Sequence, residues 1–357
     1  GGPGGGRVSR HAPGVGVTSP RSSTDPTEFG PVYIGGLDRS GKTTMRAYLA
    51  SHSNIAIPAV GSNMWPYFYR QYGDLADPEN LDRCLDAMFR YKHVRFLDPD
   101  RARVEAEFAT GPPTYARLFA ILLEQFARRE GKPRWGAQTG LIERYADEIF
   151  DAYPGVKFIH MLRDPRDRYE ASLSRWPDGR GRAGGATARW RYSTRLAQRH
   201  VDRHPGRYLI VRFEDLVRAT EETLQTVCRF IGEPWEPEMM SMSAAPELMG
   251  KLGITGGTVP RLSDEYIGLF RDRVPVDEVA FMQLHAGRVM DSFGYERVPI
   301  DWRAAERLRF LTRAWPDQAA RMMAWRTVEE LQQRFPTLVR RRPGARMMAE
   351  PVRPSRS

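Results

Sequence analysis

The strand–loop–helix pattern of residues 32–51 restricts the fold more than any other feature of the chain. Val32-Tyr33-Ile34 is a short apolar run of residues that favour β-strands. A glycine-bearing loop, Gly36–Thr43, follows it, and a helical pattern runs from there to Ser51. Such a segment is typical of a domain in which strands of one sheet are connected by helices.

The same alternation recurs along the chain. Further β-prone apolar runs lie at 55–57, 156–162 and 208–211. Helical spacing of apolar residues, or helix start and stop residues, mark the segments 77–89, 115–126, 141–153, 165–176, 185–200, 220–230 and 276–293. Strands that alternate with helices predict an α/β fold, with a parallel β-sheet flanked by helices on both faces.

Composition divides the chain into three parts. Residues 1–30 are rich in Gly, Pro and Ser and lack the apolar core of a secretory signal, so we expect a disordered leader. Residues 31–297 carry the alternating pattern and are expected to form a single α/β domain. Residues 298–357 start with a helical pattern near 304–334 and then become rich in Arg and Pro, which predicts a basic tail, partly helical and then disordered.

The net charge of +10 lies mainly in this tail. Residues 301–357 hold thirteen arginines against six acidic residues, whereas residues 31–300 are close to balance. We therefore favour a solvated tail around Arg340, Arg341 and Arg342, with contact to a polyanion as the alternative. The overall charge does not indicate the function.

Two cysteines and the hydropathy of the chain bear on its location. Cys84 and Cys228 have no metal-type spacing and fall at apolar positions of expected helices, so we expect buried free thiols, as suits a reducing cytoplasm. No apolar run approaches the ~18 to 20 residues of a membrane helix. These features predict a soluble, cytoplasmic protein.

The loop from Gly36 to Thr43 carries a phosphate-binding pattern. Its sequence, GLDRSGKT, matches G-x-x-x-x-G-K-[ST], and it has the preceding strand and following helix that this motif requires. Glycines let the backbone approach an anion, and the N–H groups at the helix start point towards it. Lys42 adds a positive charge, while Thr43 and Thr44 add hydroxyl donors, and each charge-assisted bond contributes roughly 1.5 to 3 kcal/mol.

This loop also resembles the 5'-phosphosulfate loop of sulfotransferases, whose common bacterial form is G-x-x-R-S-G-T-T, with Lys42 where that family usually has Thr. The loop alone thus fits a sulfotransferase, an ATP-dependent kinase or NTPase, or a non-catalytic nucleotide-binding protein. A P-loop kinase holds Mg²⁺ partly through an acid at the end of a second buried strand. Two expected strands end near acids, at Asp164 and at Glu214-Asp215, but Asp164 lies between Arg163 and Pro165, an unusual place for a metal ligand.

A strand-to-helix segment around Arg163 favours the sulfotransferase interpretation. It resembles the family's 3'-phosphate-binding motif, in which an Arg at a strand end and a Ser in the next helix hold the nucleotide's 3'-phosphate. By match these residues are Arg163 and Ser172. The family's Ser usually stands where this chain has Ala171, so the match is firmer for Arg163, and Ser174 is a further possibility for the hydroxyl. An ion pair of Arg163 with Asp164 or Asp167 is the structural alternative.

With both motifs in order, the chain is identified as a member of the sulfotransferases that use 3'-phosphoadenosine-5'-phosphosulfate (PAPS). The resemblance spans about 31–297 and implies a P-loop-like fold and in-line transfer of a sulfuryl group to a hydroxyl or amine. It places PAPS on Arg39, Ser40, Gly41, Lys42, Thr43, Thr44, Arg163 and Ser172. Arg39 and Lys42 are the implied catalytic residues, because they can stabilise charge on the bridging oxygen. The chemistry implies no metal.

The base that accepts the acceptor's proton is not assigned. Where some family members carry a Lys and a His, this chain has Gln138 and Gly140, and residues 59–63, where others carry a Glu, hold no acid. The candidates that remain, each also explained as a surface or capping residue, are His52, Asp74 and Glu143. The acceptor, a carbohydrate, lipid, peptide or small metabolite, stays open. The aromatic cluster at 65–69 would either pack in the core or stack on a sugar or aromatic acceptor.

Overall fold

The computed structural model of the protein describes residues 30–175, 177–179, 181–244, 264–335, 341 and 343–348. The leader expected at 1–30 lies outside these residues except for Gly30, and so does the end of the expected tail. The division of the chain at residues 30 and 297 therefore stays a prediction.

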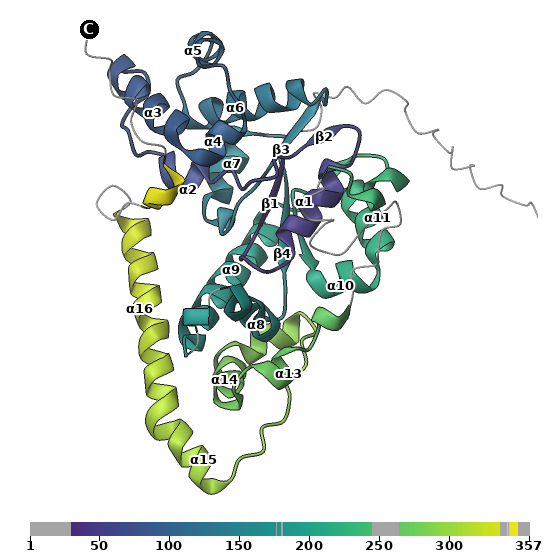
Figure 1. The fold of residues 1–357 in the computed structure, drawn as a ribbon, viewed down its shortest axis with the longest axis vertical. Helices are drawn as coiled ribbons and strands as arrows, with labels where there is room; N and C mark the ends of the chain where they lie inside the picture. Colours follow the sequence, from purple (N-terminus) through teal and green to yellow (C-terminus); the bar gives the residue numbers. More distant parts are fainter. Residues whose placement is uncertain are drawn as a thin grey trace, which may run out of the picture.

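A five-stranded parallel sheet, in the order β2-β3-β1-β4-β5, forms the centre of the fold (Figure 1). Its strands are β1 (Val32–Gly36), β2 (Ile55–Ala56), β3 (Arg134–Gln138), β4 (Lys157–Leu162) and β5 (Tyr208–Arg212). Every pairing is parallel, and four of the five strands coincide with the apolar runs of the sequence. The α/β class is confirmed.

Strand β3 was not predicted from the sequence. Its residues, RWGAQ, are neither continuously apolar nor alternating, yet the strand lies inside the sheet between β1 and β2. A Cβ atom on Gly136 would stand 2.8 Å from the carbonyl oxygen of Val32 on β1. The glycine that weakened the strand pattern is therefore required by the close approach of the neighbouring strand.

Helices surround the sheet. The α-helices are α1 (Lys42–Ala50), α2 (Met64–Phe68), α3 (Pro78–Arg90), α4 (Lys92–Phe96), α5 (Arg101–Ala109), α6 (Tyr115–Arg129), α7 (Ala146–Ala152), α8 (Pro165–Arg175), α9 (Ala183–Arg203), α10 (Phe213–Arg218), α11 (Thr220–Ile231), α13 (Phe270–Arg273), α14 (Val276–Ser292), α15 (Ala304–Arg309) and α16 (Trp315–Arg334). Short 3₁₀ turns are η1 (Ile142–Tyr145), η2 (Pro177–Gly179), η3 (Pro237–Ser241), η4 (Asp264–Tyr266) and η6 (Ala345–Met347), and a π-helical turn, η5 (Phe310–Ala314), joins α15 to α16.

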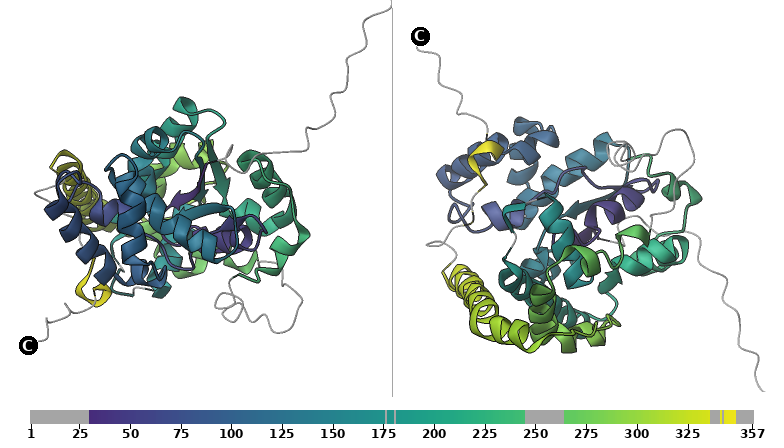
Figure 2. Two further views of the ribbon diagram at one scale, coloured as in Figure 1. Left: turned by 90° about the horizontal axis from the view of Figure 1, so that it is seen from above. Right: turned by 60° about the horizontal axis from the view of Figure 1, so that its bottom comes forward.

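Both faces of the sheet are covered, as predicted. Val32 and Ile34 of β1 pack with α1 and α11 on one face, and α1 lies beside α11 in both views of Figure 2. Tyr33, between them in the sequence, points to the other face, where it joins a core built from α2 to α7 and part of α9. Alternate residues of one strand thus supply two separate cores.

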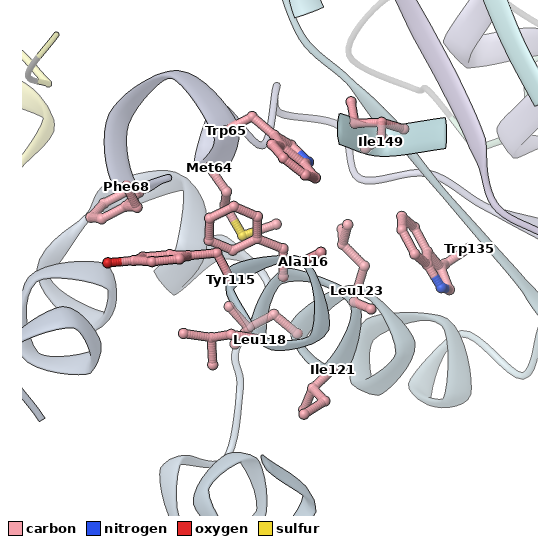
Figure 3. Close-up of a cluster of buried hydrophobic side chains, with 14 of the residues drawn as sticks. Met64, Trp65, Phe68, Tyr115, Ala116, Leu118, Ile121, Leu123, Trp135 and Ile149 are labelled. Atoms are coloured by element: carbon pink, nitrogen blue, oxygen red, sulfur yellow. The ribbon is translucent and has the colours of Figure 1, made fainter. Parts of the chain in front are cut away.

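The larger core contains the apolar stripe of α6 (Figure 3). Leu118 and Leu122 of this helix are fully buried, as the helical spacing predicted, and Leu123 beside them is buried as well. Trp65 and Phe68 of the aromatic segment are buried in the same core, and the Trp65 indole donates a hydrogen bond to the Tyr33 hydroxyl at 3.0 Å. The core role weighed for this segment is thus confirmed for these two side chains.

The C-terminal helices pack onto the domain. Helix α16 lies against α9, and Gln318 of α16 accepts a hydrogen bond from the backbone N–H of Gly184 at 2.7 Å. Cys84 and Cys228 are buried and unpaired, as predicted. Within the part of the chain that the structure describes, no helix combines the length and apolar character needed to cross a membrane.

Candidate functional site

The loop between β1 and α1 lies at the carboxyl edge of the sheet, where β1 ends (Figure 1). Gly36 and Gly41 adopt φ angles of 100° and 92°, in the left-handed region that favours glycine. A Cβ on Gly36 would stand 2.2 Å from the carbonyl oxygen of Met161. No side chain caps the start of α1, so its first N–H groups are available to an anion.

The loop side chains differ in exposure. Lys42 is buried, with 5% of its side chain exposed, and its ammonium lies 3.2 Å from Oδ1 of Asp38. This ammonium holds the pKa of the Asp38 carboxyl below its ordinary value. Ser40 is buried and donates to the Leu37 carbonyl, whereas Arg39 is exposed. Thr43 is exposed and Thr44 half-buried, at the first turn of α1.

The second predicted motif lies directly against this loop. Arg163, just after β4, donates to the carbonyl oxygens of Arg39 at 3.1 Å and Tyr266 at 2.7 Å. Its guanidinium covers the Phe213 ring at 4.5 Å, and burial lowers its pKa. Arg39 in turn donates from Nε to the carbonyl of Ala171 in α8 at 3.0 Å. The structure therefore brings Arg39 and Arg163 together at one edge of the sheet.

The two acids that follow Arg163 have other partners. Asp164 forms a buried ion pair with Arg166 at 2.6 Å. Asp167 accepts two backbone N–H groups at the start of α13, at 2.7 and 3.0 Å. Neither of these acids pairs with Arg163, which makes no ion pair among the described residues. The bonds of Asp164 also leave it poorly placed as the metal ligand of a kinase-type site.

A cavity of about 570 Å³ opens beside the loop, within the size range of small-molecule sites. Asp38 is the one acidic residue among its described lining residues. Ser172 also lines the cavity, where its hydroxyl donates to the Arg168 carbonyl at 2.8 Å, but Arg163 does not. Arg163 and Ser172 form no hydrogen bond with each other, but Arg39 contacts both Arg163 and Ala171, the neighbour of Ser172. Five arginines line the same space: Arg144, Arg168, Arg182, Arg189 and Arg341.

Three of these arginines come from α8 and the start of α9. Arg168 is buried and donates to the Asp38 carbonyl at 3.3 Å, while its Nε atom has no hydrogen-bond partner. Burial lowers the pKa of Arg168 to about 10, so it is still charged at neutral pH. Arg182 and Arg189 are exposed, and their side chains form no hydrogen bond or ion pair with the described part of the chain. The cavity therefore has a positive wall.

Arg341 departs from the expected solvated tail. Only 16% of its side chain is exposed, and it pairs with the buried Glu329 of α16 at 3.0 Å. Arg144 from η1 contacts the other oxygen of the same carboxylate. Arg341 also donates to the Tyr145 hydroxyl at 3.2 Å. The tail thus supplies part of the cavity wall, because the buried Glu329 holds both Arg341 of the tail and Arg144 of η1.

None of the three acid–base candidates left by the sequence lines the cavity. His52 is buried, with Nε2 2.9 Å from the carbonyl oxygen of Pro234. Asp74 is exposed and accepts a backbone N–H two residues on. Glu143 is buried and accepts the N–H of Gly36 at 3.2 Å, behind the loop. The surface interpretation fits Asp74, which is exposed, but it is wrong for His52 and Glu143, whose side chains are fully buried.

Asp38 and Arg168 are two of the cavity residues to which the sequence patterns assigned no role. Asp38 stands inside the recognised loop, so its position was visible, but nothing in the pattern assigned it a role. A Cβ on Gly140 would lie 3.0 Å from Oδ1 of Asp38. The position at which some sulfotransferases carry a His is therefore adjacent to the Asp38 carboxylate.

Comparison with solved structures supports this fold. The sulfotransferase domain of the olefin synthase of Synechococcus PCC 7002 matches with a TM-score of 0.51 and 22% identity, over 76% of this chain and 97% of that one. The sulfotransferase domain from the curacin biosynthetic pathway matches with a TM-score of 0.50 and 18% identity, over 76% and 99%.

Curated relatives and a family model complete the comparison. A protein-tyrosine sulfotransferase of Drosophila melanogaster is 22% identical over 243 residues, 66% of this chain and 44% of that protein. Protein-tyrosine sulfotransferase 1 of Danio rerio is 25% identical over 250 residues, 66% of this chain and 62% of that protein. The chain thus spans about half the length of these relatives. The model described as "Sulfotransferase family" matches residues 31–237, more than half of the chain, and the chain therefore belongs to the sulfotransferase family.

Proposed function

We propose that the protein transfers a sulfuryl group from PAPS to a hydroxyl or amine of an acceptor. The observation that carries this proposal is the contact between the two anion-binding elements: Arg163 donates to the backbone of the loop that holds Lys42. A nucleotide with phosphates at both its 3' and 5' positions needs cations at two adjacent points. A kinase-type site is less well supported, because Asp164 pairs with Arg166.

The residues at this edge fit the donor. The left-handed glycines leave no room for side chains, and the uncapped N–H groups of α1 face outwards from the helix start, as a phosphosulfate requires. The Nε atom of Arg163 is buried without a hydrogen-bond partner, so a 3'-phosphate would satisfy it. We assign Ser40, Gly41, Thr43 and Thr44 to the phosphosulfate; Ser172 stays a prediction for the 3'-phosphate.

When bound, PAPS supplies the sulfuryl group and an adenosine bisphosphate leaving group. Lys42 and Arg39 stabilise the negative charge that develops where these two parts separate. The ion pair with Asp38 holds the Lys42 ammonium at the mouth of the loop, next to the cavity. The transfer is expected to need no Mg²⁺, since these cations and the helix start already neutralise the charge. Cytoplasmic location also stays a prediction, consistent with two unpaired buried cysteines.

Asp38 is our proposal for the base. It is the acid among the described residues that line the cavity, and it adjoins Gly140, the position of the histidine in some relatives. Its carboxylate is ionised at neutral pH and can accept a proton from an acceptor hydroxyl, although the pairing with Lys42 lowers its pKa and so makes it a weaker base than a free aspartate. The proton that leaves the acceptor would then reside on Oδ1 or Oδ2 of Asp38.

The cavity wall indicates the charge of the acceptor. Two of its five arginines share Glu329, and Arg182 and Arg189 have no acidic partner in the described part of the chain. An acceptor that carries a phosphate or carboxylate group would compensate this excess positive charge. We therefore place anionic hydroxyl compounds first among the acceptors to be screened.

Calorimetric binding tests the donor assignment. We expect adenosine 3',5'-bisphosphate to bind without metal and more tightly than ATP with Mg²⁺. Arg163→Ala should weaken the bisphosphate ~10-fold or more, since a charge-assisted bond contributes roughly 1.5 to 3 kcal/mol, and should leave adenosine 5'-phosphate nearly unchanged. Preference for ATP with Mg²⁺ would overturn the sulfotransferase assignment in favour of a kinase or NTPase.

A further inference from the structure

A cluster of three potential metal ligands lies between α7 and α9, apart from the residues of the loop and the cavity. His200 and His204 are four residues apart on α9, which places them on one face of the helix. Asp147 of α7 faces both: its Oδ1 lies 3.5 Å from Nδ1 of His200 and 3.4 Å from Nε2 of His204. One ligand atom from each residue lies within 4.8 Å of the other two.

The hydrogen bonds of His200 leave a lone pair directed into this cluster. His200 is 1% exposed, and its Nε2 lies 3.0 Å from the carbonyl oxygen of Glu143. A carbonyl only accepts, so Nε2 carries the proton and Nδ1 carries the lone pair. Nδ1 is buried and has no hydrogen-bond partner. Metal-bound histidines typically use this arrangement, one nitrogen on a backbone carbonyl and the other on the ion.

We propose that Asp147, His200 and His204 bind a divalent transition-metal ion, with Zn²⁺ the ion best suited to two imidazoles and a carboxylate. In a tetrahedral site with bonds of about 2.0 to 2.1 Å, neighbouring ligand atoms stand about 3.3 Å apart. The 3.4 and 3.5 Å separations around Oδ1 of Asp147 are close to this spacing. His204 and Asp147 form a long hydrogen bond at 3.4 Å and His200 and Asp147 form none at 3.5 Å, so an ion between the three ligands would replace one weak contact and satisfy the buried Nδ1 of His200.

Solvent can reach the site. His204 is 21% exposed and Asp147 is 42% exposed, so an ion can enter from this side and retain a water as its fourth ligand. Arg203 pairs with the other carboxylate oxygen of Asp147 at 3.2 Å, which orients Oδ1 towards the histidines. Outer contacts of this kind position metal ligands.

An ion here would connect two elements that support the proposed donor loop. Glu143 holds His200 through its backbone carbonyl, while its carboxylate accepts the N–H of Gly36 at 3.2 Å and the hydroxyl of Ser193. By joining α7 to α9, the ion would hold Glu143 and therefore the start of the loop. The role is structural, because none of the three ligands lines the cavity.

Metal titration of the full chain, freed of affinity tags and treated with EDTA, tests the proposal. Co²⁺ should develop visible d–d absorption at one ion per chain, and Zn²⁺ should displace it and raise the melting temperature. His204→Gln should weaken Zn²⁺ binding at least ~10-fold. His285→Gln, a half-buried histidine on α14, is the matched control and should bind like the original chain.

A second variant keeps the test decisive if His204→Gln folds poorly. Asp147→Asn removes the half-exposed carboxylate and should weaken Zn²⁺ binding to a similar extent, with the helical circular dichroism unchanged. Absence of stoichiometric Zn²⁺ binding by the original chain, or equal binding by the variants, would overturn the site. Binding of adenosine 3',5'-bisphosphate, measured on the same samples, reports separately on the proposed function.

Discussion

The two halves of the candidate site are built in different ways. The donor half is one continuous stretch, residues 36–44, in which glycines and the N–H groups of a helix start do most of the binding. The cavity half takes its five arginines from η1, α8, the N-cap and first turns of α9, and the segment beyond α16. Backbone geometry over nine residues is encoded locally, whereas the convergence of side chains from four elements depends on tertiary packing.

The difference also appears in how each half is held. Gly36 of the donor loop packs against the backbone of β4, so the loop is fixed by the sheet itself. Arg144 and Arg341 of the cavity are fixed by Glu329, a single buried carboxylate on a C-terminal helix. We therefore expect the donor half to tolerate changes in distant segments and the cavity half to depend on them.

The largest effect should come from Lys42, the buried cation of the donor half. Lys42→Ala should lower turnover by ~10² to 10³, the loss typical for removal of one group that stabilises transition-state charge. Steady-state sulfuryl transfer at saturating donor measures it, with Lys92→Ala, an exposed lysine on α4, as the control. A near-normal rate would mean that the backbone N–H groups and Arg39 stabilise the transition-state charge without Lys42. Catalysis by the donor half would then depend still more on backbone geometry.

The next largest effect concerns the acid that holds the cavity wall. Glu329→Gln should lower the free energy of unfolding by about 3 kcal/mol, because it leaves Arg144 and Arg341 without their buried counter-charge. Urea unfolding at neutral pH measures the change. Glu330→Gln, the exposed neighbour, should leave the midpoint within experimental error. Equal midpoints for both variants would show that the tail is separable from the domain.

The comparison explains how far the sequence could predict this protein. Strands β1, β4 and β5 and their following helices carry strong local patterns, and the two nucleotide motifs sit at their ends. Strand β3 was not predicted because its glycine breaks the local strand pattern. Gly136 is required by the close approach of the neighbouring strand β1, which the sequence around Gly136 does not show. A local pattern cannot report a requirement that another strand imposes.

The residues missed at the site share this cause. The role of Arg341 depends on α16 packing against α9, which no spacing in the tail indicates. His200 and His204 show helical spacing in the sequence, yet Asp147 joins them only through the packing of α7 on α9. Asp38 lay within a recognised motif, but its place in the cavity appears only once Gly140 is beside it.

Asp38 lies where the two halves meet. Its substitution should change the free energy of unfolding least among these variants and should still lower the rate clearly. Asp38→Asn should lower kcat about 100-fold if this carboxylate accepts the acceptor's proton. The affinity for adenosine 3',5'-bisphosphate should change little, since the groups assigned to the phosphates are untouched. An unchanged kcat would remove Asp38 from the chemistry and leave it as a partner of Lys42 alone.

The pH dependence of stability separates these two roles of Asp38. The Asp38–Lys42 pair spans four residues and Asp38 is 69% exposed, so we expect it to contribute only ~0.3 to 0.5 kcal/mol at neutral pH. Because Lys42 depresses the folded-state pKa of Asp38 below its ordinary value of 3.8, this contribution is present above that value and is lost as pH falls through the depressed pKa. Urea unfolding of the original chain and of Asp38→Asn should thus give slightly different free energies of unfolding at pH 7, and this difference should shrink as the pH falls below 3.8. A difference well above 1 kcal/mol at pH 7 would show that Asp38 is part of the structural frame of the loop, and the loss of rate would then not identify it as the base.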